Sequence, residues 1–262
     1  MKSNLLIALL AFSIATPALA QTQNSAPLEI SADNALEWHR DKKQYIAKGN
    51  AIAEQDGTKI NADTLTANYT SSENSSTEIT EIIANGNVII TTEDGVITGD
   101  NAIYLVKEGH ATITGDTLTL TGEKLSAQAS KSFEYWTEKQ KFKAIGNAQI
   151  IEADRTLKAD EITAWFMTSD EQSNEAQNGL KQADAIGNVI IETGTDIASG
   201  DTGHYDGIKE IVTLEGNVKI LRDKNILNGT KAIVNLKTGI SQLFGDKNGG
   251  RVTGKFFPES KK

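Results

Sequence analysis

The chain has 262 residues, with 26 basic and 35 acidic side chains, a formal charge of −9 and no cysteine. A hydrophobic content of 38% with only three prolines is typical of a folded protein, and the length is sufficient for one large domain or two small ones. The acidic balance argues against a binder of nucleic acid or anionic membranes, and the lack of cysteine excludes disulfide frameworks, thiol catalysis, cysteine-ligated metal and a lipidated cysteine.

The first twenty residues have the pattern of an export signal. Lys2 precedes a short apolar run, and residues 18–20 form the A-x-A sequence that signal peptidases cleave. An uncleaved anchor is the alternative, but the apolar run is shorter than the ~20 residues that a membrane-spanning helix needs. We therefore expect residues 1–20 to be a cleaved signal peptide and residues 21–262 to be an exported mature protein.

Six imperfect repeats occupy most of the chain. Each begins with a glycine, followed by asparagine in five of the six, and the glycines are Gly49, Gly86, Gly109, Gly146, Gly187 and Gly216. Apolar residues alternate with mixed residues around each glycine, as at Ala51 and Ala53, which predicts a strand with one buried face. The intervals between the glycines are unequal, which argues against a solenoid with rungs of one fixed length.

A turn and a second strand follow within each repeat. The turns are predicted at Asp56-Gly57, Asp94-Gly95, Gly115-Asp116, Ala153-Asp154, Thr193-Gly194 and residues 222–225. In the second strand a small residue precedes an acidic one, at Asp63, Asp100, Glu123, Asp160 and Asp201. The apolar alternation changes phase at this step, which predicts a β-bulge or a corner there.

The two ends of the repeat region carry incomplete copies. Residues 28–38 match the second half of a repeat, and residues 239–257 match another partial copy. No segment has the periodicity of an amphipathic helix. We therefore predict a single all-β domain of about six repeats over residues 21–262, with about 16 or more strands.

Two groups of residues allow more than one interpretation. The acidic positions Asp63, Asp100, Asp160 and Asp201 could ligate Ca²⁺, although corner aspartates more often accept backbone N–H groups and no Asp-x-Asp-x-Asp loop is present. The aromatic side chains Phe133, Tyr135, Trp136, Trp165 and Phe166 could line a groove mouth or form a small core.

Several segments together resemble a known family. They are the export signal, TKINADTLT at 58–66, AIYLVKE at 102–108, the Gly-Asn strands and RVTGKFFP at 251–258. In this combination and order they are similar to the OstA-like family of periplasmic lipopolysaccharide-transport bridge proteins, the LptA group. The resemblance implies an elongated, twisted β-jellyroll, or two-sheet sandwich, of antiparallel strands that is open at its ends.

The resemblance also implies a function. Members of this family carry lipopolysaccharide through the periplasm for outer-membrane assembly, without catalysis and without a cofactor or metal. The implied partners are the lipid A acyl chains of lipopolysaccharide, inner-membrane LptC-like and outer-membrane LptD-like jellyroll proteins, and further copies of the chain joined end to end. We expect residues 28–38 and 240–257 to make such contacts by strand addition.

An acyl-chain carrier needs an apolar surface, since each buried CH₂ contributes about 0.8 kcal/mol. We expect a lipid-binding groove lined by Ala53, Ile60, Ile90, Ile97, Ile113, Leu120, Ile150, Leu157, Ile191, Ile220 and Leu227. Alanine and glycine at the repeated inward positions are expected to leave room for acyl chains in this groove. The same alternation of aliphatic residues is also the pattern of an ordinary sandwich core.

Two other protein classes remain open from the sequence. A secreted structural or adhesive β-repeat protein would have these repeats without a lipid ligand. A polysaccharide-cleaving β-helix would use paired carboxylates, but the acidic residues here occupy repeated positions rather than one cluster, and no catalytic motif is present.

Overall fold

The computed structural model describes residues 28–71, 77–93, 95–123, 125–167, 180–194, 196–246 and 250–257. These residues form eighteen strands and no helix, and the strand pairs are antiparallel. The predicted all-β jellyroll of 16 or more antiparallel strands is confirmed, and a β-helix, which has parallel strands, is excluded. The predicted signal peptide at residues 1–20 lies outside the described residues.

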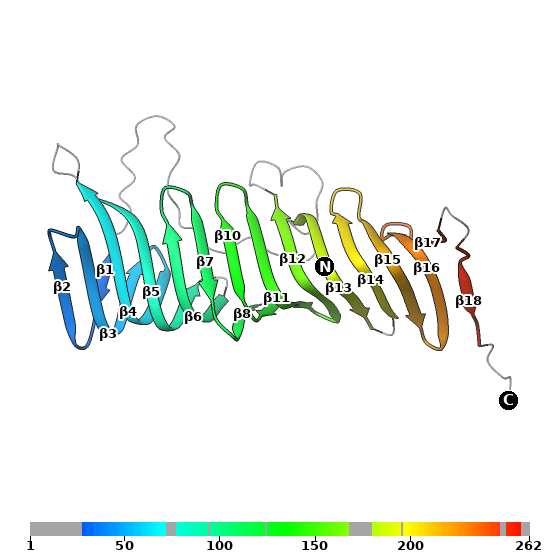
Figure 1. Cartoon of the computed structure of the whole chain (residues 1–262), viewed down its shortest axis with the longest axis horizontal. Coiled ribbons are helices and arrows are strands. Elements are labelled where there is room, and N and C mark those ends of the chain that lie inside the picture. Colours follow the sequence, from blue (N-terminus) through cyan, green and yellow to red (C-terminus); the bar gives the residue numbers. More distant parts are fainter. Residues whose placement is uncertain are drawn as a thin grey trace. The chain divides into compact units, whose positions relative to one another are not determined.

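The strands fall into two compact units, which we describe one at a time. The first contains β1 to β8 with β10, and the second contains β9 with β11 to β18. The first unit's strands are β1 (Glu29–Ser31), β2 (Ala35–His39), β3 (Gln44–Gln55), β4 (Thr58–Ser71), β5 (Thr77–Thr92), β6 (Gly95–Leu105), β7 (His110–Thr114), β8 (Leu118–Gly122) and β10 (Ser132–Trp136) (Figure 1). The second unit's strands are β9 (Leu125–Ala129), β11 (Lys141–Glu152), β12 (Arg155–Phe166), β13 (Leu180–Thr193), β14 (Asp196–Asp206), β15 (Ile211–Arg222), β16 (Asn225–Asn235), β17 (Ser241–Phe244) and β18 (Thr253–Lys255). Within the described residues, no helix has the length and hydrophobicity needed to cross a membrane.

Tight turns join the long strands. Asp56 and Gly57 link β3 to β4 with φ values of 47° and 78°, the positive pair that a type I′ turn requires. The turns predicted at residues 153–154 and 222–225 are also confirmed. Two others differ from the prediction in their strand ends, since Gly95 already pairs with Thr92 in β6 and Thr193 still pairs with Asp196 in β13.

The turn predicted at Gly115-Asp116 is wrong. Both β7 and β8 pair with β6, so the chain turns a corner between them instead of forming a hairpin. In this repeat the leading glycine, Gly109, lies in the turn before β7, where its N–H donates to the Val106 carbonyl at 3.2 Å. Corners of the same kind separate β1 from β2, which both pair with β3, and β17 from β18, which both pair with β16.

A β-bulge lies at the Gly-Asn pair of β3, and the registers of β5, β13 and β15 shift at theirs. In β3, Lys48 pairs with Thr64 and Ala51 pairs with Ala62, so Gly49 and Asn50 together oppose the single residue Asp63. Both bulge residues have positive φ here and in the other in-strand copies, which are Gly86-Asn87, Gly146-Asn147, Gly187-Asn188 and Gly216-Asn217. The bulge predicted at the small–acidic step is therefore confirmed, with its left-handed residues on the opposing strand.

The core lies beside these bulges. On one face, which we call the inner face, small side chains next to each bulge are almost completely buried, among them Ala51, Val88, Val189 and Val218. Because the strands change phase at the acidic residue, buried side chains continue on the inner face along both halves of each strand. The inner face is therefore the apolar side of each unit.

Candidate functional site

The predicted groove residues of the first unit form a continuous row across neighbouring strands. Ala53 pairs with Ile60, Ile60 with Ile90, Ile90 with Ile97, and Ile97 with Leu120. We call this inner-face set row A. Directly paired side chains lie about 4.5 to 5.5 Å apart, so row A is an unbroken aliphatic stripe.

Row A has an equivalent in the second unit. Leu157 pairs with Ile191, which pairs with Ala198, and the row continues through Ile220 to Leu227. Ile150 pairs with Ala127 of β9. The sequence columns therefore identified a real spatial alignment in both units.

Ile113 belongs to a different row. It lies on β7 and pairs with Ala102 on one side and Phe133 on the other. This second row, row B, runs on the other side of the bulges and includes Ala47, Leu65, Ala84, Ala102, Ile113 and Phe133. Row B of the second unit is Ile162, Ala185, Gly203, Leu214, Ala232 and Leu243.

The two units differ in how far the predicted groove residues are covered. In the first unit all of them except the half-buried Ile60 are buried. In the second unit every one is only half-buried, and these are Ile150, Leu157, Ile191, Ile220 and Leu227. Accessible aliphatic surface on the predicted groove residues is therefore concentrated in the second unit.

The inward glycines do not leave open space, contrary to the expectation from the sequence. A Cβ placed on Gly99 would lie 2.6 Å from Ile113 Cγ2 and 2.9 Å from Leu118 Cδ2. A Cβ on Gly229 would lie 2.7 Å from the backbone oxygen of Phe244. Glycine is required at these positions because neighbouring atoms already occupy the space that a side chain would need.

The acidic column has a structural role at the bulges. The Asp63 carboxylate occupies the space beside Gly86, where a Cβ would meet Oδ2, and it accepts hydrogen bonds from Asn87 Nδ2 at 3.2 and 3.0 Å. We call this arrangement the carboxylate clamp; it recurs at Asp160–Gly187–Asn188 and Asp201–Gly216–Asn217. Asp100 instead accepts the backbone N–H of Asp116 at the corner after β7, while Glu123 follows β8 and has no place in this arrangement. Among the described residues, no three or more histidine or acidic side chains gather in the way that a metal site requires.

The predicted aromatic group divides between core and surface-facing positions. Phe133 and Tyr135 are buried, which favours the core interpretation for these two. Trp136 stacks on His110 with ring centroids 4.5 Å apart, and Trp165 and Phe166 are half-buried on β12. A second aromatic cluster was not predicted. Trp38 stacks on Tyr45, and Tyr45 stacks on Tyr69. The strand pairing brings these residues together although they are far apart in the chain.

Tyr135 gives the core an alkaline pH dependence. Burial raises the pKa of its hydroxyl to about 12. The folded protein therefore keeps this proton between pH 10 and about 12 while the unfolded chain loses it, so stability that is complete below pH 10 is lost as the pH rises. Tyr135→Phe is expected to flatten this loss in urea denaturation compared at about pH 8 and about pH 11. An unchanged alkaline loss in the variant would contradict the assignment.

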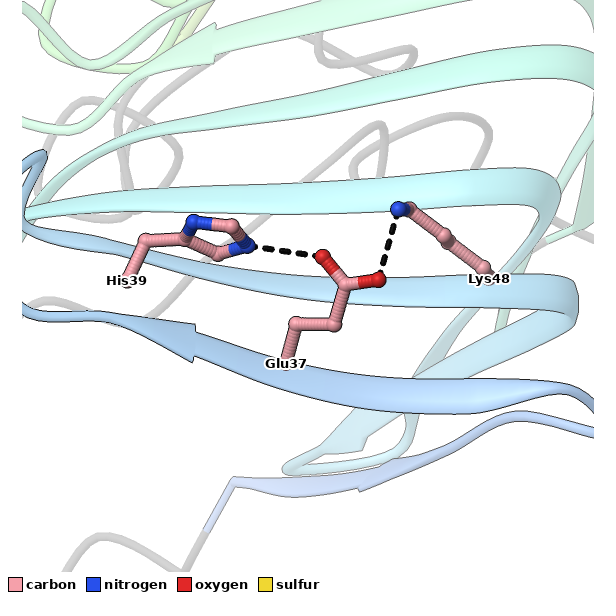
Figure 2. A network of polar contacts seen from close by, with 3 residues as sticks. All are labelled: Glu37, His39 and Lys48. Carbon is pink, nitrogen blue, oxygen red and sulfur yellow. Dashed lines mark hydrogen bonds and ion pairs between the residues drawn. The ribbon is translucent and has the colours of Figure 1, made fainter.

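Charged side chains pair on the opposite, outer face. Figure 2 shows Glu37 of β2 with Lys48 Nζ at 2.6 Å and His39 Nε2 at 2.7 Å. Hydrogen bonding to Lys48, and then to His39, lowers the pKa of Glu37. Similar cross-strand ion pairs on the outer face of the second unit are Lys143–Glu161, Lys158–Glu192 and Lys231–Glu215. Arg222 and Asp196 also pair, but on the inner-face side, at the end of the β14–β15 hairpin.

Several exposed apolar side chains lie at the two ends of the repeat region, on β2 and on or beside β17 and β18. Leu36 and Trp38 of β2 belong to the inner face yet are 62% and 54% exposed. At the other end the exposed set is Ile240, Phe244, Val252, Phe256 and Phe257. Within the described residues β2 pairs with β3 alone and β17 pairs with β16 alone.

The fold and this face define an antiparallel β-jellyroll protein with an apolar inner side and ion-paired outer side. The chain matches the family described as LptA/(LptD N-terminal domain) LPS transport protein over residues 29–170 and again over residues 129–240. It belongs to this family. The predicted family is confirmed.

Two relatives illustrate the extent of the similarity. The LPS-assembly protein LptD of Bordetella avium (strain 197N) is 34% identical over 84 residues, which are 32% of this chain and 10% of that protein. The chain thus matches about a tenth of that relative's length. LptH of Pseudomonas aeruginosa, described as the LptA homologous periplasmic component of the lipopolysaccharide transport device, is 15% identical with a TM-score of 0.28, covering 62% of this chain and 94% of LptH.

Proposed function

We propose that the chain carries lipopolysaccharide through the periplasm, with the acyl chains against its inner face and the sugars and phosphates in solvent. The observation that carries the proposal is row A of the second unit, an aliphatic stripe that crosses consecutive strands and stays half-buried. Membership in a lipopolysaccharide-transport family supplies the ligand class. The cleaved signal at residues 1–20 and the single mature domain at residues 21–262 belong to this proposal.

The energetics favour acyl chains as the occupant of this stripe. Apolar surface removed from water contributes about 25 cal/mol per Å², so covering the exposed parts of these half-buried side chains together with acyl carbons stabilises the complex. A hydrocarbon chain forms no hydrogen bonds, and the aliphatic side chains of row A have no donor or acceptor groups. Polar and charged groups of the ligand would remain outside, in solvent, where their hydration is kept.

The strands at the two ends supply the bridging part of the proposal. β2 and β17 carry exposed apolar side chains beside backbone edges that are bonded on one side in the described residues. Such edges are suited to strand addition, which would continue the inner face into a neighbouring jellyroll. The proposed neighbours are LptC-like and LptD-like proteins at the two membranes and further copies of this chain.

Site-specific photo-crosslinking tests the lipid-binding part. A benzophenone amino acid at Leu157 of row A is expected to label lipopolysaccharide, whereas the same group at the adjacent Lys158, on the outer face, is not. Adducts are detected by gel shift and anti-lipopolysaccharide blotting. Equal labelling from both positions would remove the argument for an inner-face site, and no adduct at either would favour a structural or adhesive protein.

A further inference from the structure

The inner face of the second unit has a polar row beside row A. Two residues along the strands from row A, Arg155 pairs with Thr193, Thr193 with Asp196, Asp196 with Arg222, and Arg222 with Asn225. We call this set row D. Since side chains two residues apart on a strand share a face, row D lies on the inner face, at the rim formed by the hairpin turns.

The corresponding row of the first unit has no charged side chain among the described residues. Its members are Gln55, Thr58, Thr92, Gly95 and Gly122. Row A of the first unit is largely buried, whereas row A of the second unit is half-buried. The charged side chains of row D therefore occur in the unit whose aliphatic row is accessible.

A ligand that covers row A of the second unit has room for its polar head on one side only. On the side toward the bulges, Val189 and Val218 are 0% and 1% exposed, and Ile162 and Leu214 of row B are buried as well. A sugar or phosphate group placed there would lose its hydration without gaining hydrogen bonds. On the other side the head meets row D, whose side chains supply both donors and acceptors.

Arg155 is the cation of row D that is available to an anion. Arg222 is held by Asp196, through Nε at 2.8 Å and Nη2 at 2.6 Å. Arg155 is exposed, and within the described residues it forms no ion pair, either with Glu152 across its turn or with another group. Burial raises the pKa of Tyr205, an inner-face residue of β14, while the charge of Arg155 acts to lower it. The charge of Arg155 therefore reaches the inner face, because charges act mainly within about 10 Å.

We propose that row D binds the phosphorylated sugar head of the glycolipid whose acyl chains cover row A, with Arg155 donating to a phosphate. The inference rests on the proposed function, and it adds the residues that orient the ligand. A guanidinium group binds phosphate through paired, charge-assisted N–H donors. Thr193 and Asn225 carry the hydroxyl and amide groups that suit sugar hydroxyls. Because row D lies at the rim, the outward side of the head stays in water.

Lipid A with and without its phosphates tests this role of Arg155. Dissociation constants of the full chain are measured by surface plasmon resonance, with each lipid presented in the same non-ionic detergent. Arg155→Gln is expected to weaken binding of the phosphorylated lipid about tenfold and to change binding of the dephosphorylated lipid by less than about twofold. Lys219→Gln is the matched control, since it removes the same charge from an exposed side chain on the outer face of β15. It is expected to leave both constants within about twofold of the unmodified chain.

The outcomes separate this site from the proposed function. Equal weakening of both lipids by Arg155→Gln, or equal weakening by the two substitutions, would overturn phosphate binding by Arg155. Inorganic phosphate at the concentration of the lipid is expected not to compete, since it has no acyl chains to cover row A, and competition would indicate a site for free phosphate instead. If both lipids bind and Arg155→Gln changes neither constant, the head-group site is refuted while lipid binding stands. If neither lipid binds the unmodified chain, the proposed function itself is refuted.

Discussion

Replacement of Phe133 by alanine is expected to lower the free energy of unfolding by about 3 to 5 kcal/mol, the usual range for an aromatic side chain in a packed core. Phe133 is 1% exposed and lies directly opposite Ile113 in row B. The surrounding strands are fixed by their ladders and can close the resulting cavity only in part. Urea denaturation followed by circular dichroism measures the loss.

Leu36 provides the control for this substitution, since it extends row B by pairing with Ala47 but is 62% exposed. Leu36→Ala is expected to change stability by less than about 0.5 kcal/mol at concentrations where the chain is monomeric. Similar losses from the two variants would show that the exposed end of row B is already packed in the single chain.

Replacement of Gly216 by alanine is expected to cost about 2 to 4 kcal/mol, through a left-handed backbone and the loss of a carboxylate clamp. The residue has a φ of +74°, and its new Cβ would collide with the Asp201 carboxylate, which accepts a hydrogen bond from Asn217 at 2.9 Å. The Asp201 carboxylate would have to move away from the new Cβ, and it would then lose the hydrogen bond from Asn217. The midpoint and slope of urea denaturation give the change in stability.

Gly239 separates the two causes. It has nearly the same φ, +71°, but nothing lies within 4 Å of a Cβ placed on it. Gly239→Ala is therefore expected to cost only the backbone term, about 1 to 2 kcal/mol. If the two variants lose the same stability, the clamp contributes nothing beyond the conformation of its glycine.

The sequence was most informative about the faces of the strands. Period-two alternation around Gly49 and its equivalents predicted which side chains point inward, because a strand has only two faces. The change of phase at Asp63 likewise predicted an irregular register, since nothing else can move apolar residues from one parity to the other.

The sequence could not predict what covers each inward residue. Ile97 and Leu157 stand in the same column, yet Ile97 is buried and Leu157 is half-buried, because their covering residues come from other strands. Gly115-Asp116 was misread because a Gly-Asp pair suits a corner as well as a hairpin. The inward glycines were misread because a missing side chain is compatible with both an empty space and a filled one.

Contacts within the strands explain part of the excess of acidic residues in the chain. Asp63, Asp160 and Asp201 are used in the bulges, where they accept amide hydrogen bonds. Other acidic side chains meet lysine or arginine across neighbouring strands. Most of these carboxylates therefore serve the register of the strands and the outer face.

The carboxylate clamps also fix the register of the strands that they join. A strand that slid by two residues would still point its apolar side chains inward, but it would present a residue with a Cβ where the aspartate of the preceding strand accepts only glycine. The strand pairs β4–β5, β12–β13 and β14–β15 are thereby each held in one register. A chain of this design can lengthen by whole hairpins. An added hairpin aligns on the adjacent strand through its own clamp, and the register of the other strands does not change.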